Sequence, residues 1–148
     1  MRFQLVIAGP PPAKGRPRFG NGRVYTDTKT LSAEETVRQL WREAGSPRLT
    51  GPIGVCIRCH IQRPKSHFTS KGELSAKGQR EKKPTSKPDL SNTWKVIEDG
   101  LNHLAFADDS QIVEAHVYKH WVLHLDRHVP CTELDVYELE PATEALAA

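Results

Sequence analysis

The sequence predicts an α/β (α+β) protein: one small domain over residues 1–148, with a mixed β-sheet of about four to five strands and two main helices. Three observations support this prediction. The chain of 148 residues is long enough for one domain with a hydrophobic core. Apolar residues make up 37% and charged residues 26%, which argues against a membrane protein or a disordered one. Segments with strand-like alternation are interleaved with two segments of helical periodicity.

The first elements are a strand and a basic loop. Residues 2–8 alternate and are rich in Phe, Leu, Val and Ile, so we expect a strand. Gly9 and the three prolines after it end the strand, because proline fixes φ and lacks an N–H donor. The following Gly/Pro-rich loop contains no acid and carries Lys14, Arg16, Arg18 and Arg23. Val24 and Tyr25 are candidates for a short strand.

A helix and a second long strand follow. Thr30 or Ser32 is the expected helix cap, and Ser32 and Glu35 have capping-box spacing. The helix is expected to end near Ala44, with one apolar face made of Val37, Leu40, Trp41 and Ala44. Residues 52–62 read as a strand in which apolar positions alternate with Cys56, Arg58 and His60.

Residues 63–88 show no periodicity and carry eight basic residues against two acids. A loop of this length in a compact domain is usually functional or disordered. Two interpretations remain open: a solvated flexible insertion, or a mobile arm that binds phosphate groups.

The last third predicts one helix and two strands. Asp89 begins a helix whose Leu90, Trp94, Ile97 and Leu101 form one apolar stripe. After a turn, Asp108 and Asp109 precede a long alternating strand from about residue 113 to 125. Residues 132–139 read as the final strand, and residues 141–148 as a flexible tail.

The two parts of the chain carry opposite charge. Residues 1–88 contain 18 Lys/Arg and 6 Asp/Glu, whereas residues 89–148 contain 3 Lys/Arg and 12 Asp/Glu. The basic part indicates a polyanionic partner, most simply a nucleic acid. Carboxylates repel phosphate groups, and a divalent metal would reconcile the two parts. Three cysteines, no secretory signal and no apolar run near 20 residues favour a cytoplasmic protein.

Two other motifs match patterns of haem attachment and of metal binding, but the geometry of a strand argues against both. Cys56 and Cys59 match the haem-attachment pattern C-x-x-C-H, but a strand would direct them to opposite faces, so no haem is expected. Histidines recur every four residues at positions 116, 120, 124 and 128. On a strand this spacing covers about 13 Å, which is too wide for two ligands of one ion.

The candidate chemistry lies in residues 87–112. Asp89 stands at a helix start, where the helix dipole favours an anion, and Asp109 stands at the start of a strand that could bring a second carboxylate alongside. Carboxylate oxygens and a substrate phosphate are ligands typical of Mg²⁺. Lys95 could reach over such a site and neutralise charge on a phosphate. Taken singly, Asp89 could be a simple N-cap and the Asp108-Asp109 pair an exposed turn; together with the basic part they favour metal-assisted phosphodiester hydrolysis.

These motifs resemble those of RusA-type Holliday junction resolvases, a family common in prophages. The resemblance covers about residues 5–119, in the expected order. It rests on Lys-Pro-Asp-x-x-Asn-x-x-Lys from Lys87, Asp-Gly-Leu-Asn from Asp99, Asp-Asp-Ser-Gln-Ile from Asp108, and the basic loop of residues 11–18.

The resemblance implies a homodimer that cuts four-way DNA junctions with Mg²⁺, for which Mn²⁺ can substitute. By position, Asp89 and Asp109 match the catalytic carboxylates and Lys95 the catalytic lysine. Asp108 is a neighbouring metal-binding acid. The expected DNA contacts are Lys14, Arg16, Arg18, Lys87 and Lys119.

One position departs from the family pattern Asp-x-Asp-Asn, because Ser91 stands where the middle carboxylate is expected. A hydroxyl is a weak neutral ligand for Mg²⁺. Either Asp108 or Glu98 compensates, or metal binding is weak and the protein binds junctions better than it cuts them; an engineered inactivating change is a further explanation.

The functional alternatives are therefore a nuclease, a catalytically silent junction-binding protein, and a basic nucleic-acid-binding domain without junction preference. The dimer contact is expected on the exposed face of the strand from His116 to His124 or on the first helix, and the sequence does not decide between them.

Overall fold

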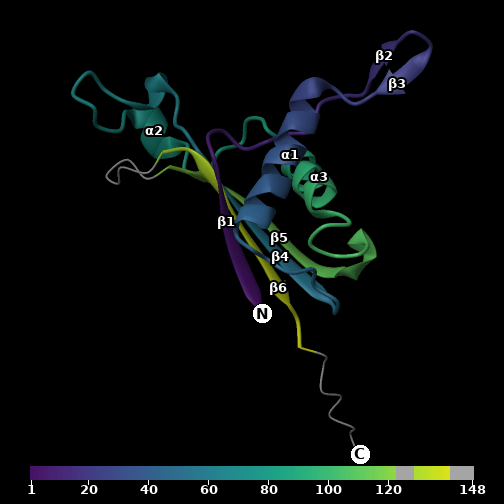
Figure 1. The fold of residues 1–148 in the computed structure, drawn as a ribbon. Helices are drawn as coiled ribbons and strands as arrows, with labels where there is room; N and C mark the ends of the chain where they lie inside the picture. The colour runs from purple at the N-terminus through teal and green to yellow at the C-terminus, as the bar shows by residue number, and fades with distance from the viewer. Residues whose placement is uncertain (123–128, 141–148) are drawn as a thin grey trace, which may run out of the picture.

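A computed structural model describes residues 1–122 and 129–140 of the chain. Its main feature is a mixed four-stranded sheet with the order β1-β6-β4-β5 (Figure 1). The strands are β1 (Arg2–Ala8), β4 (Ile53–Ile61), β5 (Ile112–Trp121) and β6 (Cys131–Glu138). β6 runs antiparallel to both β1 and β4, whereas β4 and β5 are parallel. The predicted mixed sheet is confirmed.

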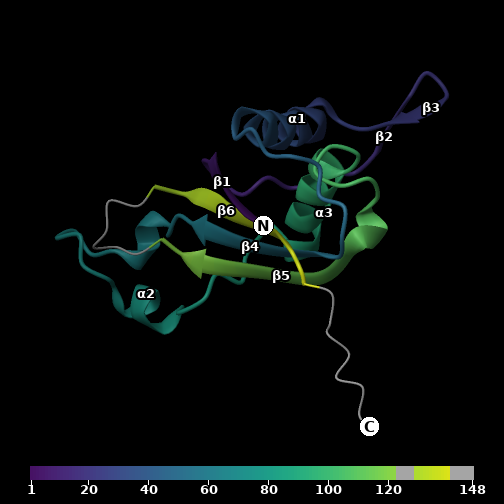
Figure 2. The ribbon, with the colours of Figure 1, turned by 60° about the horizontal axis from the view of Figure 1, so that its bottom comes forward.

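Two helices, α1 (Thr28–Glu43) and α3 (Leu90–Leu101), lie on the same side of the sheet (Figure 2). They pack closely at Gly100, where a Cβ atom would stand 2.9 Å from the Cβ of Val37. Val37 and Trp41 of α1 and Ile97 and Leu101 of α3 are buried in the core formed with the sheet. The predicted helices and these core positions are confirmed, whereas Ala44 is exposed as the C-cap of α1.

The start of α1 lies earlier than the sequence predicts. Asp27, not Thr30 or Ser32, is the N-cap, and its carboxylate accepts a hydrogen bond from the Thr30 N–H at 2.9 Å. Thr30 is instead a buried residue of the first turn, and its hydroxyl accepts from the Gly15 N–H. This contact attaches the basic loop to α1.

The basic loop contains a hairpin rather than one short strand. β2 (Arg18–Gly20) pairs antiparallel with β3 (Arg23–Tyr25) around a turn in which Asn21 and Gly22 both have positive φ. This Asn-Gly pair is a common two-residue hairpin turn. The hairpin projects away from the sheet (Figure 1), and Phe19 is 82% exposed near its tip.

Residues 63–88 have local structure that the sequence does not predict. They form a 3-10 turn, η1 (Lys65–His67), and a short helix, α2 (Ala76–Arg80), joined by a bridge between Phe68 and Leu74. His67 is fully buried, and its Nε2 lies 2.9 Å from the Glu81 carboxylate. The Trp121 indole N–H donates to the Glu81 carbonyl at 2.7 Å. The segment is therefore docked on the end of β5.

β4 shows the predicted alternation. Val55, Ile57 and Cys59 are buried, whereas Cys56 is half-buried on the opposite face. Cys56 and Cys59 therefore do not face one site, as the sequence predicts. The strand predicted from about residue 113 to 125 is β5, which ends at Trp121. The last three residues of that prediction, which include His124, lie outside the described residues, as does His128. So does the predicted tail of residues 141–148.

A close contact sets the start of β5. Gly54 stands opposite Tyr137, and a Cβ atom on Gly54 would meet the Tyr137 ring at 2.2 Å. The Tyr137 hydroxyl donates to Glu114 at 2.8 Å across the irregularity where β4 and β5 shift register.

The helices of the described residues are all too short or too polar to span a membrane.

Candidate active site

The start of α3 presents a carboxylate that has no hydrogen-bond or ion-pair partner among the described residues. Asp89 is the N-cap residue, but its side chain makes no capping hydrogen bond. It is exposed, and no described residue forms an ion pair with it. Asp89 therefore has the position of an N-cap without its hydrogen bond, and its carboxylate is free for a ligand near the positive end of the helix dipole. Just before this position, the peptide bond between Lys87 and Pro88 is cis.

Lys119 connects the end of β5 to the entry of α3. Its ammonium donates to the carbonyls of Ser86 at 2.7 Å and Pro88 at 3.1 Å. These two contacts hold the segment that leads into α3 against the end of β5. The predicted DNA contact is thus also a structural residue.

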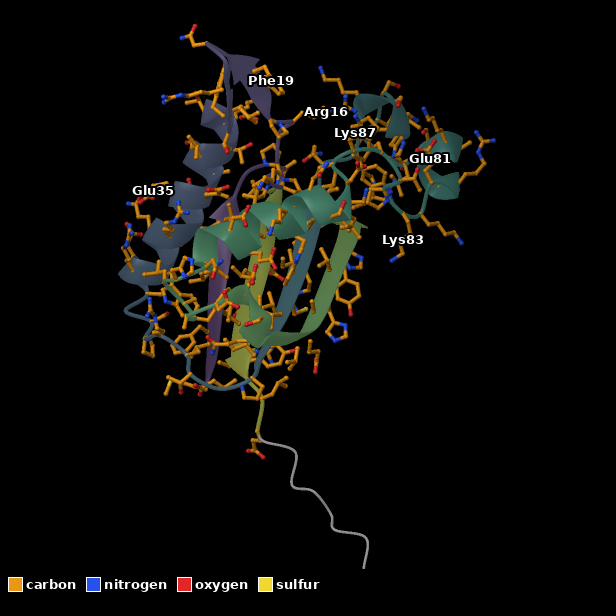
Figure 3. The ribbon with its side chains drawn as sticks, turned by 90° about the vertical axis from the view of Figure 1, so that its right-hand side faces the viewer. Arg16, Phe19, Glu35, Glu81, Lys83 and Lys87 are labelled. Carbon is orange, nitrogen blue, oxygen red and sulfur yellow. The ribbon has the colours of Figure 1, made fainter. Side chains whose placement is uncertain are left out.

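The basic loop passes along the first turn of α3. The Lys14 N–H donates to the Asn92 carbonyl at 3.1 Å, so the loop is attached close to Asp89. Arg16 and Lys87 are both exposed and lie near the start of α3 in Figure 3. Arg18 is exposed on the hairpin beyond them. These three predicted DNA contacts are therefore accessible to a polyanion.

Lys14 and Lys95 belong to an ion-pair cluster further along α3. Lys95 Nζ lies 2.8 Å from Glu98 and 3.2 Å from Asp99, and Lys14 Nζ lies 2.7 Å from the other Asp99 oxygen. The hydrogen bond to Glu98 is the main cause that raises the pKa of Lys95 to about 12. Burial alone would raise the pKa of Asp99, but the hydrogen bonds from Lys14 and Lys95 outweigh it and lower that pKa. Lys95 remains charged but is engaged with these acids.

The second pair of acids lies before β5, on the 3-10 turn η2 (Asp109–Gln111). Asp108 caps this turn and accepts hydrogen bonds from the Ser110 N–H and hydroxyl. The Ser110 hydroxyl is the main cause that lowers the pKa of Asp108. Asp109 is half-buried, and its carboxylate forms no hydrogen bond or ion pair within the described residues. Asp109 is thus a second free carboxylate.

Gln111 holds η2 in place. Its carbonyl oxygen accepts from the N–H groups of Ala107 and Asp108, and its amide donates to the Gly51 carbonyl at 3.1 Å. Sequence reasoning missed this role. The sequence feature that indicates this role is the capping-box spacing between Asp108 and Gln111, and the structure contains that capping box.

One chain does not bring Asp89 and Asp109 together. Lys119 places the start of α3 at the end of β5, whereas Asp109 precedes the first residue of that strand. Lys119 is the seventh residue after Ile112, a distance of about 23 Å at the rise of a strand. The two carboxylates therefore lie toward opposite ends of β5. No group of three or more His, Cys, Asp or Glu among residues 1–122 and 129–140 has the geometry of a metal site.

Comparison with known proteins identifies the family. The family model of the endodeoxyribonuclease RusA matches residues 8–129. The chain belongs to the RusA family. It is also similar to an uncharacterized protein, YqaN, of Bacillus subtilis strain 168, with 33% identity over 122 residues that cover 79% of this chain and 86% of the relative. Membership of the RusA family places the protein among the endodeoxyribonucleases.

Ser91, which departs from the RusA pattern stated above, is exposed in the first turn of α3, two residues after Asp89. Neither acid considered as a substitute stands beside it in the same chain. Glu98 is seven residues further along α3, about 10 Å at the rise of a helix, and binds Lys95. Asp108 lies with Asp109 before β5 and binds Ser110. Within one chain, neither Glu98 nor Asp108 therefore stands beside Asp89.

Proposed function

We propose that this RusA-family protein is a homodimeric endonuclease that binds four-way DNA junctions and hydrolyses their phosphodiester bonds with Mg²⁺ or Mn²⁺. The family match over residues 8–129 is the observation that carries the proposal. It is supported by the carboxylates of Asp89 and Asp109, which have no hydrogen-bond or ion-pair partner among the described residues. Other acids of the motif region, such as Asp99, are held by cationic side chains.

The residues of this chain supply three parts of such a site. Asp89 and Asp109 offer carboxylate oxygens, the ligands that Mg²⁺ prefers. A divalent cation held there would supply charge neutralisation and a bound water of lowered pKa. Arg16, Arg18 and Lys87 would contact DNA phosphates, which gives affinity without reading sequence. One chain keeps the two carboxylates too far apart for a shared cation, so a second copy is needed to complete the site.

The direct test is a cleavage assay on a synthetic four-way junction. We expect nicked product in the presence of Mg²⁺ or Mn²⁺, none after chelation, and a loss of at least 100-fold for Asp109→Asn. Glu43→Gln is a matched control, since Glu43 is an exposed acid at the end of α1 that contacts Gln39. Cleavage that is unchanged in Asp109→Asn would contradict the proposal.

A second function is favoured by one observation, the exposed hydroxyl of Ser91 where the family pattern has a carboxylate. In this alternative the protein binds junctions without cutting them. Ser91→Asp then converts a silent binder into a nuclease, whereas Ser91→Asn, which adds volume but no charge, does not. Equal affinity for duplex and four-way DNA at matched salt would instead indicate a basic domain without junction preference.

A further inference from the structure

A pocket with a basic lining lies between residues 63–88 and the end of β5. We call it the basic pocket, and it is lined by Arg63, Leu74, Lys82, Lys83, His120, Trp121 and Val122. Its volume is about 280 Å³. Four of the seven lining residues are basic and none is acidic. Pockets for small organic ligands are mostly apolar and measure about 300–1,000 Å³, so this pocket has neither their lining nor their size.

The cations of the basic pocket have no carboxylate partner. Within the described residues, Arg63, Lys82 and Lys83 form no ion pair. Arg63 donates to a main-chain carbonyl, that of Gly78, at 2.9 Å. The neighbouring acid, Glu81, lies outside the lining and holds a buried histidine at 2.9 Å. Unpaired like charges around one hollow create a positive potential, so the pocket is favourable for an anion.

The frame of the basic pocket is fixed by packing. The Arg63 guanidinium lies 5.2 Å from the centre of the Trp121 ring, and the ring of His67 stands edge-on to the same indole at 5.2 Å. The indole N–H donates to the Glu81 carbonyl at 2.7 Å. Trp121 is thus engaged by its neighbours, and the pocket offers cations to a ligand instead of a free ring on which a base could stack.

The chain leads directly from the basic pocket to Asp89. Lys119 holds residues 86–88 against the end of β5, and Figure 3 shows Lys83 beside that end of the strand. Asp89 is the sixth residue after Lys83, so their Cα atoms are at most about 22 Å apart. A DNA strand rises about 3.4 Å per nucleotide, so this distance corresponds to about six nucleotides at most.

We propose that the basic pocket binds a backbone phosphate of the DNA strand that extends from Asp89, within about six nucleotides of the bond that is cut. Lys82 and Lys83 supply most of the charge, and Arg63 and His120 form the walls. Residues 63–88 are then a docked phosphate-binding element, neither a solvated insertion nor a mobile arm. The proposal rests on the proposed function, because it takes the reacting strand to lie at Asp89.

A pair of double variants tests the pocket. Lys82→Ala with Lys83→Ala removes two exposed lysines of the lining. We expect junction binding to weaken about tenfold and the slope of log K against log salt to fall by about 2, because two phosphate contacts are lost. Lys65→Ala with Lys71→Ala is the matched control, since it removes the same charge from exposed lysines of the same segment outside the pocket. Equal losses in the two double variants would overturn the proposal.

Neutral methylphosphonate linkages locate the phosphate that is bound. They are placed one at a time in the junction, over about six nucleotides on either side of the cleaved bond. At the phosphate that occupies the pocket, the substitution should weaken binding by the parent but not by the Lys82→Ala, Lys83→Ala variant. If every linkage affects both proteins equally, the pocket does not contact the strand.

His120 reports on the occupant of the basic pocket. Burial is the main cause that lowers the pKa of His120, and the charges of Lys83, His60 and Arg58 lower it further. The acid on the adjoining strand, Glu133, is bound to Arg58 at 2.9 Å and lies 3.4 Å from His60. A bound phosphate opposes the charge of these cations, so it should raise the pKa of His120.

This change has a sign that can be measured. Because binding raises the pKa of His120, junction affinity should increase as the pH falls through that value. His120→Gln should lose this increase, whereas His116→Gln, an exposed position of the same strand, should retain it. A His120 pKa that NMR shows to be the same with and without junction DNA would contradict the contact.

Cleavage at saturating DNA separates this proposal from the proposed function. The pocket contacts no reacting atom, so Lys82→Ala with Lys83→Ala should cut bound junctions at the parental rate. A parent that binds junctions without cutting them would reject the proposed function, and the binding measurements would still decide the role of the pocket. Inorganic phosphate is the comparison ligand: if it saturates the His120 signal at sub-millimolar concentration, the pocket is a site for a small anion and the assignment to DNA is wrong.

Discussion

The Lys119 ammonium lies 3.1 Å from the Pro88 carbonyl oxygen, and this contact joins the end of β5 to the start of α3. It also donates to the Ser86 carbonyl, so Lys119 holds the segment that leads into Asp89. Its position explains why Asp89 and Asp109 occupy opposite ends of one strand.

Replacing Lys119 should affect both folding and cleavage. We expect Lys119→Ala to lower the free energy of unfolding by about 1 kcal/mol, because two main-chain acceptors lose a charged donor. Junction cleavage should fall more than junction affinity, since Asp89 loses its orientation. Urea titration and binding assays check this, with Arg16→Ala as the comparison, which should weaken affinity without changing stability. Identical behaviour of the two variants would mean that Lys119 only contacts DNA.

Asp99 should contribute a pH-dependent part of stability. Its pKa is lowered in the folded protein, so its ion pairs stabilise the fold above pH 4 and this stabilisation is lost as the pH falls through the lowered pKa. We expect Asp99→Asn to lose less stability than the parent between pH 6 and pH 2.5. The difference should stay below about 1 kcal/mol, because Lys95 is 44% exposed and solvent screens the pair.

The control for this prediction is Asp89→Asn, whose parent carboxylate has no cation partner among the described residues. Its stability should follow the parent's across the same pH range. Lys95, with its pKa raised to about 12, contributes in the opposite sense: its stabilisation is present below pH 10 and is lost above pH 12. An Asp99→Asn variant as sensitive to acid as the parent would show that these ion pairs do not stabilise the fold.

The projecting hairpin should contribute to DNA affinity. Arg18 and Arg23 are exposed at the two ends of its paired strands, and Phe19 offers an exposed ring that can stack on an unpaired base. We expect Arg18→Ala with Arg23→Ala to reduce the slope of log K against log salt by about 2, roughly one for each lost phosphate contact. Unfolding should be unchanged, because these side chains lie outside the core.

Phe19→Ala is expected to act differently from the arginine changes. Loss of a stacking ring should weaken binding to four-way junctions more than binding to duplex DNA and leave the salt slope unaltered. Arg42→Ala, which removes an exposed α1 arginine paired with Glu35, is the control and should change neither quantity. If Phe19→Ala and Arg42→Ala give equal affinities, the hairpin tip does not touch unpaired bases.

Much of the fold follows from periodicity. The alternation of Val55, Ile57 and Cys59 correctly predicts the buried face of β4, and the spacing of Ile97 and Leu101 correctly predicts that of α3. The start of α1 was missed because Asp27 caps the helix from within a basic, glycine-rich loop. Residues 63–88 lack periodicity because their structure depends on the buried side chain of His67 and on docking to Trp121.

The candidate site was predicted in part. The sequence identifies Asp89 and Asp109 as acids of two separate motifs, and both carboxylates are free within the described residues. It does not reveal their separation, because the spacing of two motifs says nothing about the direction in which a helix crosses the next strand. The side chain of Lys119 shows that direction.

The most direct test of the central claim is junction cleavage by a mixed dimer of Asp89→Asn and Asp109→Asn. Each variant alone should be inactive. In the mixed dimer, one site receives both substitutions and the other receives neither, so we predict nicking of one strand per binding event at about half the parental rate. Inactivity of the mixed dimer, when subunit exchange is verified, would contradict the claim that the two carboxylates act together across the dimer.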